Sequence, residues 1–185
     1  MSRAASTTSL RNKLRRFRRS RRGSAAVEFA LVAPVFFALL FAIIETALVF
    51  FASQVLETIT QDSARMIFTG QAQTAGYSQA QFHDYVCSQI PALFNCNSVY
   101  VDVQSYPSFA SVVINSQIDA SKNFINNMKY CPGNAGDIIV VRLFYQWPMF
   151  VTGLGYNITN LAGSQRLLSA TAAFMNEPFA VSSAC

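Results

Sequence analysis

The sequence predicts an α+β protein in which a long N-terminal transmembrane helix is followed by a small antiparallel-sheet head with one or more short helices. Three observations carry this prediction. An apolar run covers residues 29–52, a helical pattern continues beyond it to about residue 69, and from residue 98 onward apolar residues alternate with a period of two. The 185 residues suffice for one membrane segment and one ordinary domain.

The first 22 residues form a basic arm. They hold nine of the fourteen Lys and Arg residues, whereas all nine Asp and Glu residues follow Gly23. The net charge of +5 is therefore the sum of a basic arm and an acidic body. Arginine clusters also bind nucleic-acid phosphates, but beside a membrane segment they orient the anchor and bind anionic lipid. We therefore expect a cytoplasmic arm and no nucleic-acid partner.

The apolar run of residues 29–52 predicts a transmembrane helix. Its 24 residues exceed the length needed to cross a hydrocarbon core. Its Leu, Ile, Val and Phe residues favour insertion by about 4.5 to 9 kcal/mol, which outweighs roughly 3 kcal/mol for the one acid, Glu45. Pro34 predicts a kink. A secretory signal is disfavoured, because cleavage after Ala52 would place the bulky Phe50 where such sites need a small residue.

A second acid, Glu28, lies five residues after Gly23. The stretch RRGSAAVEFALVAP, residues 21–34, resembles the cleavage region of a type IV prepilin, which a membrane peptidase cuts after a glycine that follows a basic leader. The resemblance implies a processing site between Gly23 and Ser24. The new Ser24 ammonium would share a helix face with Glu28, which could pair with it or with the amine of a neighbouring subunit. The competing interpretation is a lone glutamate at the membrane interface.

More specifically, the chain resembles the TadE-like family of minor pilins or pseudopilins of the tight-adherence (Flp) pilus. The resemblance implies an assembly role for Glu28, Phe29 and Glu45. Its implied partners are the prepilin peptidase, other pilins, the inner-membrane assembly platform and the lipid bilayer. Met175 stands where the family often has an arginine. The matching features are Gly23, Ala26, Val27, Glu28, Phe29, Ala30, Pro34, Glu45, Ala64, Arg65, and the stretches GDIIVVRLFYQWP (136–148) and NEPF (176–179).

These expectations divide the chain into three parts: a cleaved cytoplasmic leader at residues 1–23, a long helix at 24–69 with its transmembrane half at 29–52, and a periplasmic α+β head at 70–185. The protein is expected to be a single-pass protein of a bacterial inner membrane, with the extracellular pilus as a further location. An uncleaved, membrane-anchored envelope domain that binds a ligand is the alternative.

Local signals place the remaining elements. Gly70 is expected to end the long helix, and a capping box of Ser78 and Gln81 begins a helix that runs to about Ile90. The long loop after the second strand, residues 146–163, is interpreted either as a lid over the core or as a contact surface. The alternating pattern predicts strands at residues 98–106, 137–147 and 166–175.

Catalytic and metal-binding patterns are missing from the sequence. His83 is the single histidine and no Cys-x-x-Cys occurs, so we expect His83 to be a surface or packing residue, and the protein to be no enzyme and to bind no cofactor or metal. The four cysteines, Cys87, Cys96, Cys131 and Cys185, follow the membrane segment, and their even number favours two disulfides in an oxidising compartment. Of three pairings we favour Cys87–Cys96 with Cys131–Cys185; four free thiols are the alternative.

Overall fold

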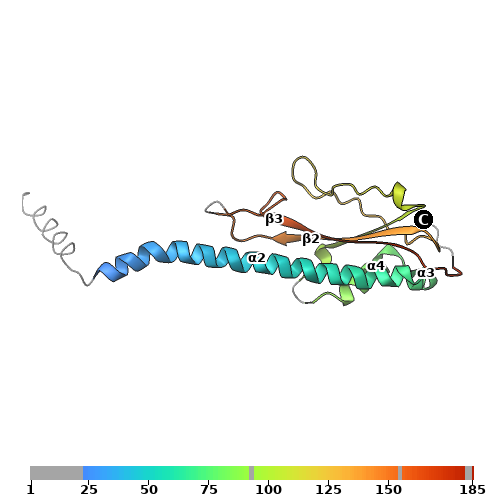
Figure 1. Cartoon of the computed structure of the whole chain (residues 1–185), viewed down its shortest axis with the longest axis horizontal. Coiled ribbons are helices and arrows are strands. Elements are labelled where there is room, and N and C mark those ends of the chain that lie inside the picture. Colours follow the sequence, from blue (N-terminus) through green and yellow to red (C-terminus); the bar gives the residue numbers. More distant parts are fainter. Residues whose placement is uncertain (1–22, 92–93, 154–155, 182–184) are drawn as a thin grey trace, which may run out of the picture. The chain divides into compact units, whose positions relative to one another are not determined.

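The computed structural model describes residues 23–91, 94–153, 156–181 and 185 (Figure 1). The chain divides into two compact units, one that ends at Ile43 and one that covers Ile44–Cys185. The boundary falls inside the long helix, so the C-terminal part of this helix belongs to the same unit as the sheet. The expected leader, apart from Gly23, lies outside the described residues.

Helix α2 (Ser24–Phe68) is the long helix that the sequence predicts. Within the described residues it is the one helix long and apolar enough to cross a membrane, which makes it a candidate anchor. Its apolar side chains in the first unit are largely exposed; Phe29 is 69% exposed. Helix α2 ends before Gly70, whose φ of 74° lies in the left-handed region that favours glycine.

Three strands form an antiparallel sheet in the order β1-β2-β3. They are β1 (Val99–Tyr106), β2 (Ile138–Pro148) and β3 (Gln165–Met175), within one residue of the predicted bounds. In the register, Val103 pairs with Val141, which pairs in turn with Ala172. The α+β fold class with a small antiparallel sheet is therefore confirmed.

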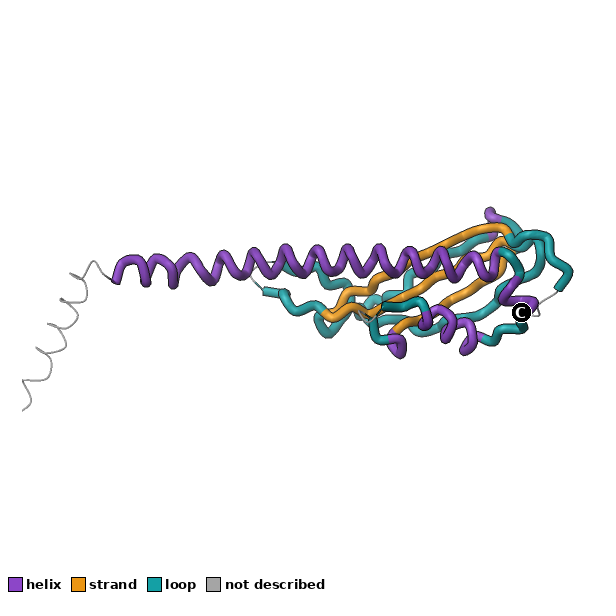
Figure 2. The backbone as a smooth tube through the Cα atoms, turned by 90° about the horizontal axis from the view of Figure 1, so that it is seen from below, coloured by secondary structure: helices purple, strands orange, loops and turns teal. Residues whose placement is uncertain are grey.

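One face of the sheet packs against helices α2 and α4 (Gln79–Ser88), and Figures 1 and 2 both show the strands beside the part of α2 that belongs to the second unit. The predicted capping box begins α4: the Gln81 N–H donates to Ser78 Oγ, and the Ser78 N–H donates to Gln81 Oε1 at 2.9 Å. Helix α4 ends at Ser88, two residues before the expected end. The one-turn helix α3 (Gln71–Thr74) was not expected.

The other face of the sheet carries a buried ion pair between adjacent strands. Asp102 on β1 faces Arg142 on β2, and Arg142 donates to Asp102 Oδ2 from Nη2 at 2.7 Å and from Nε at 3.0 Å. The Lys129 N–H donates to Asp102 Oδ1 at 2.9 Å. The segment between β1 and β2, which contains the short helix η3 (Phe109–Ser111), thereby packs on this face; Phe124 contacts the rings of both Tyr100 and Phe144.

Candidate functional site

The first turn of α2 contains the residues of the expected processing and assembly sites. Gly23 directly precedes the helix, Ser24 is its first residue, and Glu28 and Phe29 are exposed on the following turn. A Cβ added at Gly23 would meet no described atom within 4 Å, and the φ of Gly23 does not lie in the left-handed region. The fold of the described residues therefore places no steric demand for glycine at position 23.

Glu45 lies on the same helix in a different environment. Its residue is only 6% exposed, and its carboxylate accepts backbone hydrogen bonds from the loop that follows β2. The Phe150 N–H donates to Oε1, and the Val151 N–H donates to Oε1 at 3.2 Å and to Oε2 at 3.0 Å. The neighbouring Thr46 hydroxyl is hydrogen-bonded to the hydroxyl of Tyr156 in the same loop. Glu45 therefore fastens this loop to α2.

The long loop partly fits both interpretations that the sequence allowed. Met149 is buried in the core, as expected of a lid, whereas Phe150 beside it is 84% exposed, as expected of a contact surface. The sequence could not predict the hydrogen bonds between this loop and Glu45. Their donors are backbone N–H groups, which any residue except proline supplies.

Two disulfides stabilise the second unit, with the pairing favoured from the sequence. Cys87 at the end of α4 is bonded to Cys96 in the short helix η2 (Cys96–Ser98), with Cα atoms 5.6 Å apart. Cys131 is bonded to the C-terminal Cys185 across 54 residues of sequence, with Cα atoms 5.1 Å apart. The second bond crosslinks the C-terminus to the segment that enters β2.

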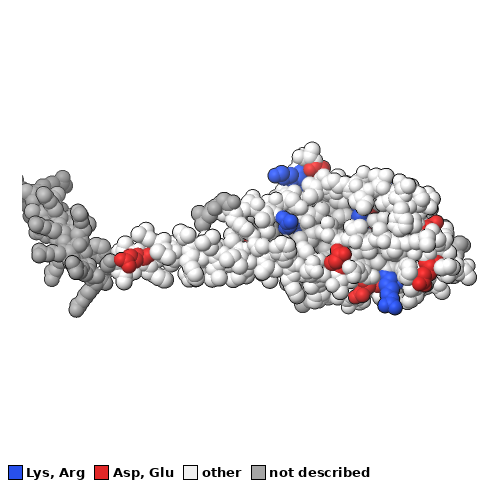
Figure 3. Space-filling model, viewed as in Figure 1, with Lys and Arg blue, Asp and Glu red and all other residues white. Residues whose placement is uncertain are grey.

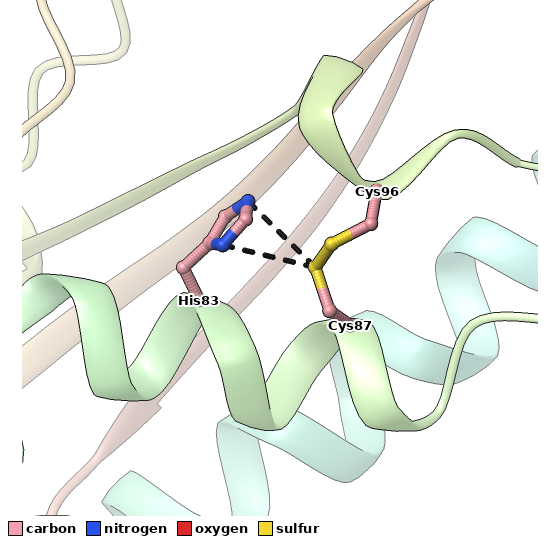
Figure 4. Close-up of side chains that lie close together, drawn as sticks. All are labelled: His83, Cys87 and Cys96. Carbon is pink, nitrogen blue, oxygen red and sulfur yellow. Dashed lines mark hydrogen bonds between the residues drawn. A yellow bond between two sulfur atoms is a disulfide. The ribbon is translucent and has the colours of Figure 1, made fainter.

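His83, Cys87 and Cys96 form the one cluster of potential metal ligands among the described residues (Figure 4). Both sulfur atoms belong to the disulfide and are therefore not thiolates, the form of cysteine that binds a metal. The two ring nitrogens of His83 lie 3.7 Å from Cys87 Sγ, and Nε2 is 3.2 Å from the carbonyl oxygen of Val99. His83 thus packs between the disulfide and strand β1, and the three residues do not form a metal site in this state.

Charged side chains on the second unit are scattered. The face drawn in Figure 3 shows isolated Lys, Arg, Asp and Glu residues and no patch of one sign among the residues that the structure describes. Asp102 and Arg142 are both buried and bonded to each other, at 2.7 Å. Sequence reasoning missed this pair, because Asp102 occupies a polar position of the alternation, between Val101 and Val103, where an exposed residue is expected.

Asn176, in the stretch NEPF, is another buried polar residue, and the sequence singled it out only by resemblance. Its amide donates to the carbonyl oxygens of Pro132 at 3.0 Å and Asn134 at 3.1 Å. The next residue, Glu177, donates its N–H to the Phe68 carbonyl at the end of α2. The stretch therefore connects the end of the sheet to the end of the helix.

Comparison with known proteins supports the resemblance seen in the sequence. Residues 23–65 match the family model described as TadE-like protein. The match begins at Gly23, contains Glu28 and Glu45, and ends at Arg65, so the suspected family is confirmed over this segment. No curated protein and no solved structure matches the chain.

Proposed function

We propose that this chain, TadE-like over residues 23–65, is a minor pilin or pseudopilin of the tight-adherence (Flp) pilus. A prepilin peptidase removes the basic leader between Gly23 and Ser24. Helix α2 then holds the protein in the bacterial inner membrane, from which it joins other pilins at the assembly platform. Glu28 pairs with a Ser24 ammonium, its own or that of a neighbouring subunit, during assembly.

Membrane anchoring and an association with the pilus have direct support. The TadE-like match and the candidate membrane helix support a membrane-anchored protein associated with the tight-adherence pilus. The TadE-like family is a family of pilus-associated structural proteins, which favours a structural role over an enzymatic one. We propose in addition the processing by a peptidase, the assembly through Glu28 and the individual partners.

The observation that carries the proposal is the start of α2. The fold of the described residues does not require glycine at position 23, whereas a peptidase that must accommodate the scissile bond at the membrane face has a reason to require it. Helix α2 begins at Ser24, so cleavage would place an ammonium on its first residue and Glu28 one turn further along. An isolated surface glutamate would explain Glu28 but not the glycine before it.

The orientation follows from charge and from redox chemistry. Lys and Arg beside a membrane segment stay on the cytoplasmic side, and residues 1–22 hold nine of them. Disulfides persist in oxidising compartments such as the bacterial periplasm, and both disulfides lie in the second unit. Both arguments favour a periplasmic head.

The test compares two glutamates of one helix. Glu28→Gln should abolish pilus formation and co-purification with the major pilin while leaving the amount of membrane-inserted protein unchanged. Glu57→Gln is the matched control, because Glu57 lies on α2 beyond the apolar run and accepts a long hydrogen bond from Gln61, one turn further along the same helix, at 3.4 Å. Normal pili from the Glu28 variant would contradict the assembly role and favour the uncleaved, ligand-binding envelope domain.

A further inference from the structure

The loop after β2 is uncharged and begins with three apolar residues, Met149, Phe150 and Val151. No charged residue occurs between Arg142 and Arg166, and we define the apolar loop here as residues 149–153 together with Tyr156. Met149 is buried, but the side chain of Phe150 is 84% exposed, the largest exposed fraction among the large apolar residues described in the second unit. Because packing within the head does not explain so exposed an aromatic residue, we looked for a contact outside the head.

Hydrogen bonds fix the position of the apolar loop along α2. The Phe150 and Val151 N–H groups both donate to the Glu45 carboxylate, and Tyr156 is bonded to Thr46. Two separate points of the loop are therefore attached to two consecutive helix residues. All of these residues belong to the second unit, so the attachment holds wherever the first unit lies relative to it.

This position lies towards the outer end of the expected membrane segment, residues 29–52. A helix needs about 20 residues to cross the hydrocarbon core, so a span that starts anywhere between Ser24 and Phe29 ends at about residues 43–48. Helix residues at the same level expose large apolar side chains: Ile44 is 45%, Leu48 is 44% and Phe51 is 58% exposed. The apolar loop therefore lies next to apolar helix surface, at the depth where the bilayer meets water.

We infer that the apolar loop inserts Phe150 into the outer leaflet of the bilayer that α2 spans, and that the head thereby has a second attachment to the membrane. The occupant is lipid because the surface is continuous with the membrane helix, contains no charge and carries the aromatic residues typical of membrane interfaces. The inference rests on α2 being a membrane helix, but neither on cleavage nor on pilus assembly.

The inference also accounts for Glu45. An acid inside an apolar run is costly because lipid offers it no hydrogen bonds. Here the loop supplies backbone N–H donors to both carboxylate oxygens and covers the residue to 6% exposure. The loop provides the hydrogen bonds that the buried carboxylate needs, and the carboxylate holds the loop at the membrane surface. Glu45 is a positioning residue in this arrangement.

The test uses a tryptophan introduced at the loop. The full-length chain, carrying Phe150→Trp and the native Trp147, is reconstituted into phosphatidylethanolamine/phosphatidylglycerol vesicles in which part of the lipid bears a nitroxide high on its acyl chain. The control is Phe109→Trp, which also replaces an exposed phenylalanine, at 61%. Phe109 follows the end of β1 that pairs with the start of β2, whereas Phe150 follows the end of β2, about 35 Å away along this 11-residue strand.

The nitroxide lipid should quench the added fluorescence of the Phe150→Trp variant at least threefold more strongly than that of the Phe109→Trp variant. Adding Glu45→Ala to Phe150→Trp should reduce this difference. Vesicle flotation first selects inserted protein, so failed insertion, which would count against the membrane helix, is distinguished from a loop that stays out of the lipid.

Two results would overturn the inference. The first is equal, weak quenching of both introduced tryptophans in floated vesicles. The second is a tryptophan at position 150 that is shielded from aqueous acrylamide but not quenched by the nitroxide lipid, since a neighbouring protein then covers the loop.

Discussion

Glu28 and Glu45 lie seventeen residues apart on the same helix, yet their surroundings are opposite. Glu28 is exposed on the first turns of α2, in the unit that ends at Ile43. Glu45 is buried in the second unit, where loop N–H groups donate to both of its carboxylate oxygens. The two acids look equivalent in an apolar sequence, but of the two only Glu45 accepts hydrogen bonds from the loop of the head.

The difference shows how one helix can serve two purposes. In the second unit α2 is a core element, with Leu56 and Ile67 fully buried against the sheet, and its acid stabilises a loop of the same chain. In the first unit its apolar side chains are largely exposed. Glu45 is consequently a poor control for Glu28, because replacing it disturbs the head; Glu57 is the better choice.

If burial decides what an acid does here, the most buried acid should show the largest effect on stability. Asp102 is 1% exposed and is bonded to Arg142, so Asp102→Ala leaves a buried guanidinium without its counter-ion and should cost about 3–5 kcal/mol of the free energy of unfolding. Denaturation of the full chain in mild detergent, followed by the fluorescence of the single Trp147, measures this loss. Asp62→Ala is the exposed control, and a loss below about 1 kcal/mol for Asp102→Ala would contradict the account.

Glu45→Ala should have the next largest effect, and a more local one. Removing the carboxylate takes the acceptor from the Phe150 and Val151 N–H groups, and hydrogen bonds to a charged group each contribute about 1.5–3 kcal/mol. Hydrogen exchange should show that these two amides lose protection while the amides of β2 keep theirs. Glu45→Gln retains one acceptor and should lose less. Unchanged exchange at both amides in the alanine variant would show that Glu45 does not hold the loop.

Tyr130 is the converse of Glu45, because its hydroxyl is buried without a hydrogen-bond partner among the described residues. Burial, assisted by nearby Tyr77, raises the pKa of Tyr130 to about 12. Because the folded state favours the neutral phenol, its contribution to stability is complete below about pH 10 and is lost as the pH rises towards 12. Given the partial exposure of Tyr130, we expect roughly 1 kcal/mol across this range. Tyr130→Phe should flatten this alkaline loss without destabilising the head at neutral pH; an unchanged alkaline profile would contradict the assignment.

Glu28→Gln should have the smallest effect on the head. Because Glu28 is exposed and lies in the other unit, the denaturation midpoint reported by Trp147 should shift by less than the equivalent of about 0.5 kcal/mol. The same variant should nevertheless fail in pilus assembly. A destabilised head would mean that any assembly defect arises from folding, which would remove the contrast between the two acids.

Local signals were sufficient to predict most of the architecture. The apolar run and the helical pattern that continues beyond it to Gly70 gave the extent of α2, Ser78 and Gln81 marked the start of α4, and alternating residues placed each strand to within one residue. Each of these signals comes from residues that are neighbours in sequence. Helix α3 was missed because it depends on a tertiary contact: Gly70 turns the chain in a left-handed conformation, and the ring of Phe179 packs so closely that a Cβ there would lie 2.6 Å from it.

The contacts of the two buried acids were not predictable. Glu45 and Phe150 are 105 residues apart, and the contact uses a backbone N–H that carries no sequence signature. Asp102 and Arg142 are 40 residues apart and meet only because β1 and β2 pair in one register. The family resemblance included Glu45 but not the reason for its position in α2. Long-range pairings of this kind require the three-dimensional fold.

The central claim is that α2 becomes an assembly element when the leader is removed, because the Ser24 ammonium that Glu28 would meet exists only after cleavage. The most direct test is the N-terminus of the membrane-extracted protein from cells that make the pilus, determined by N-terminal sequencing and intact mass. The account predicts a chain that begins Ser24-Ala25-Ala26, and a Gly23→Val variant that keeps the 23-residue leader. A wild-type chain that retains its basic arm in those cells would contradict it.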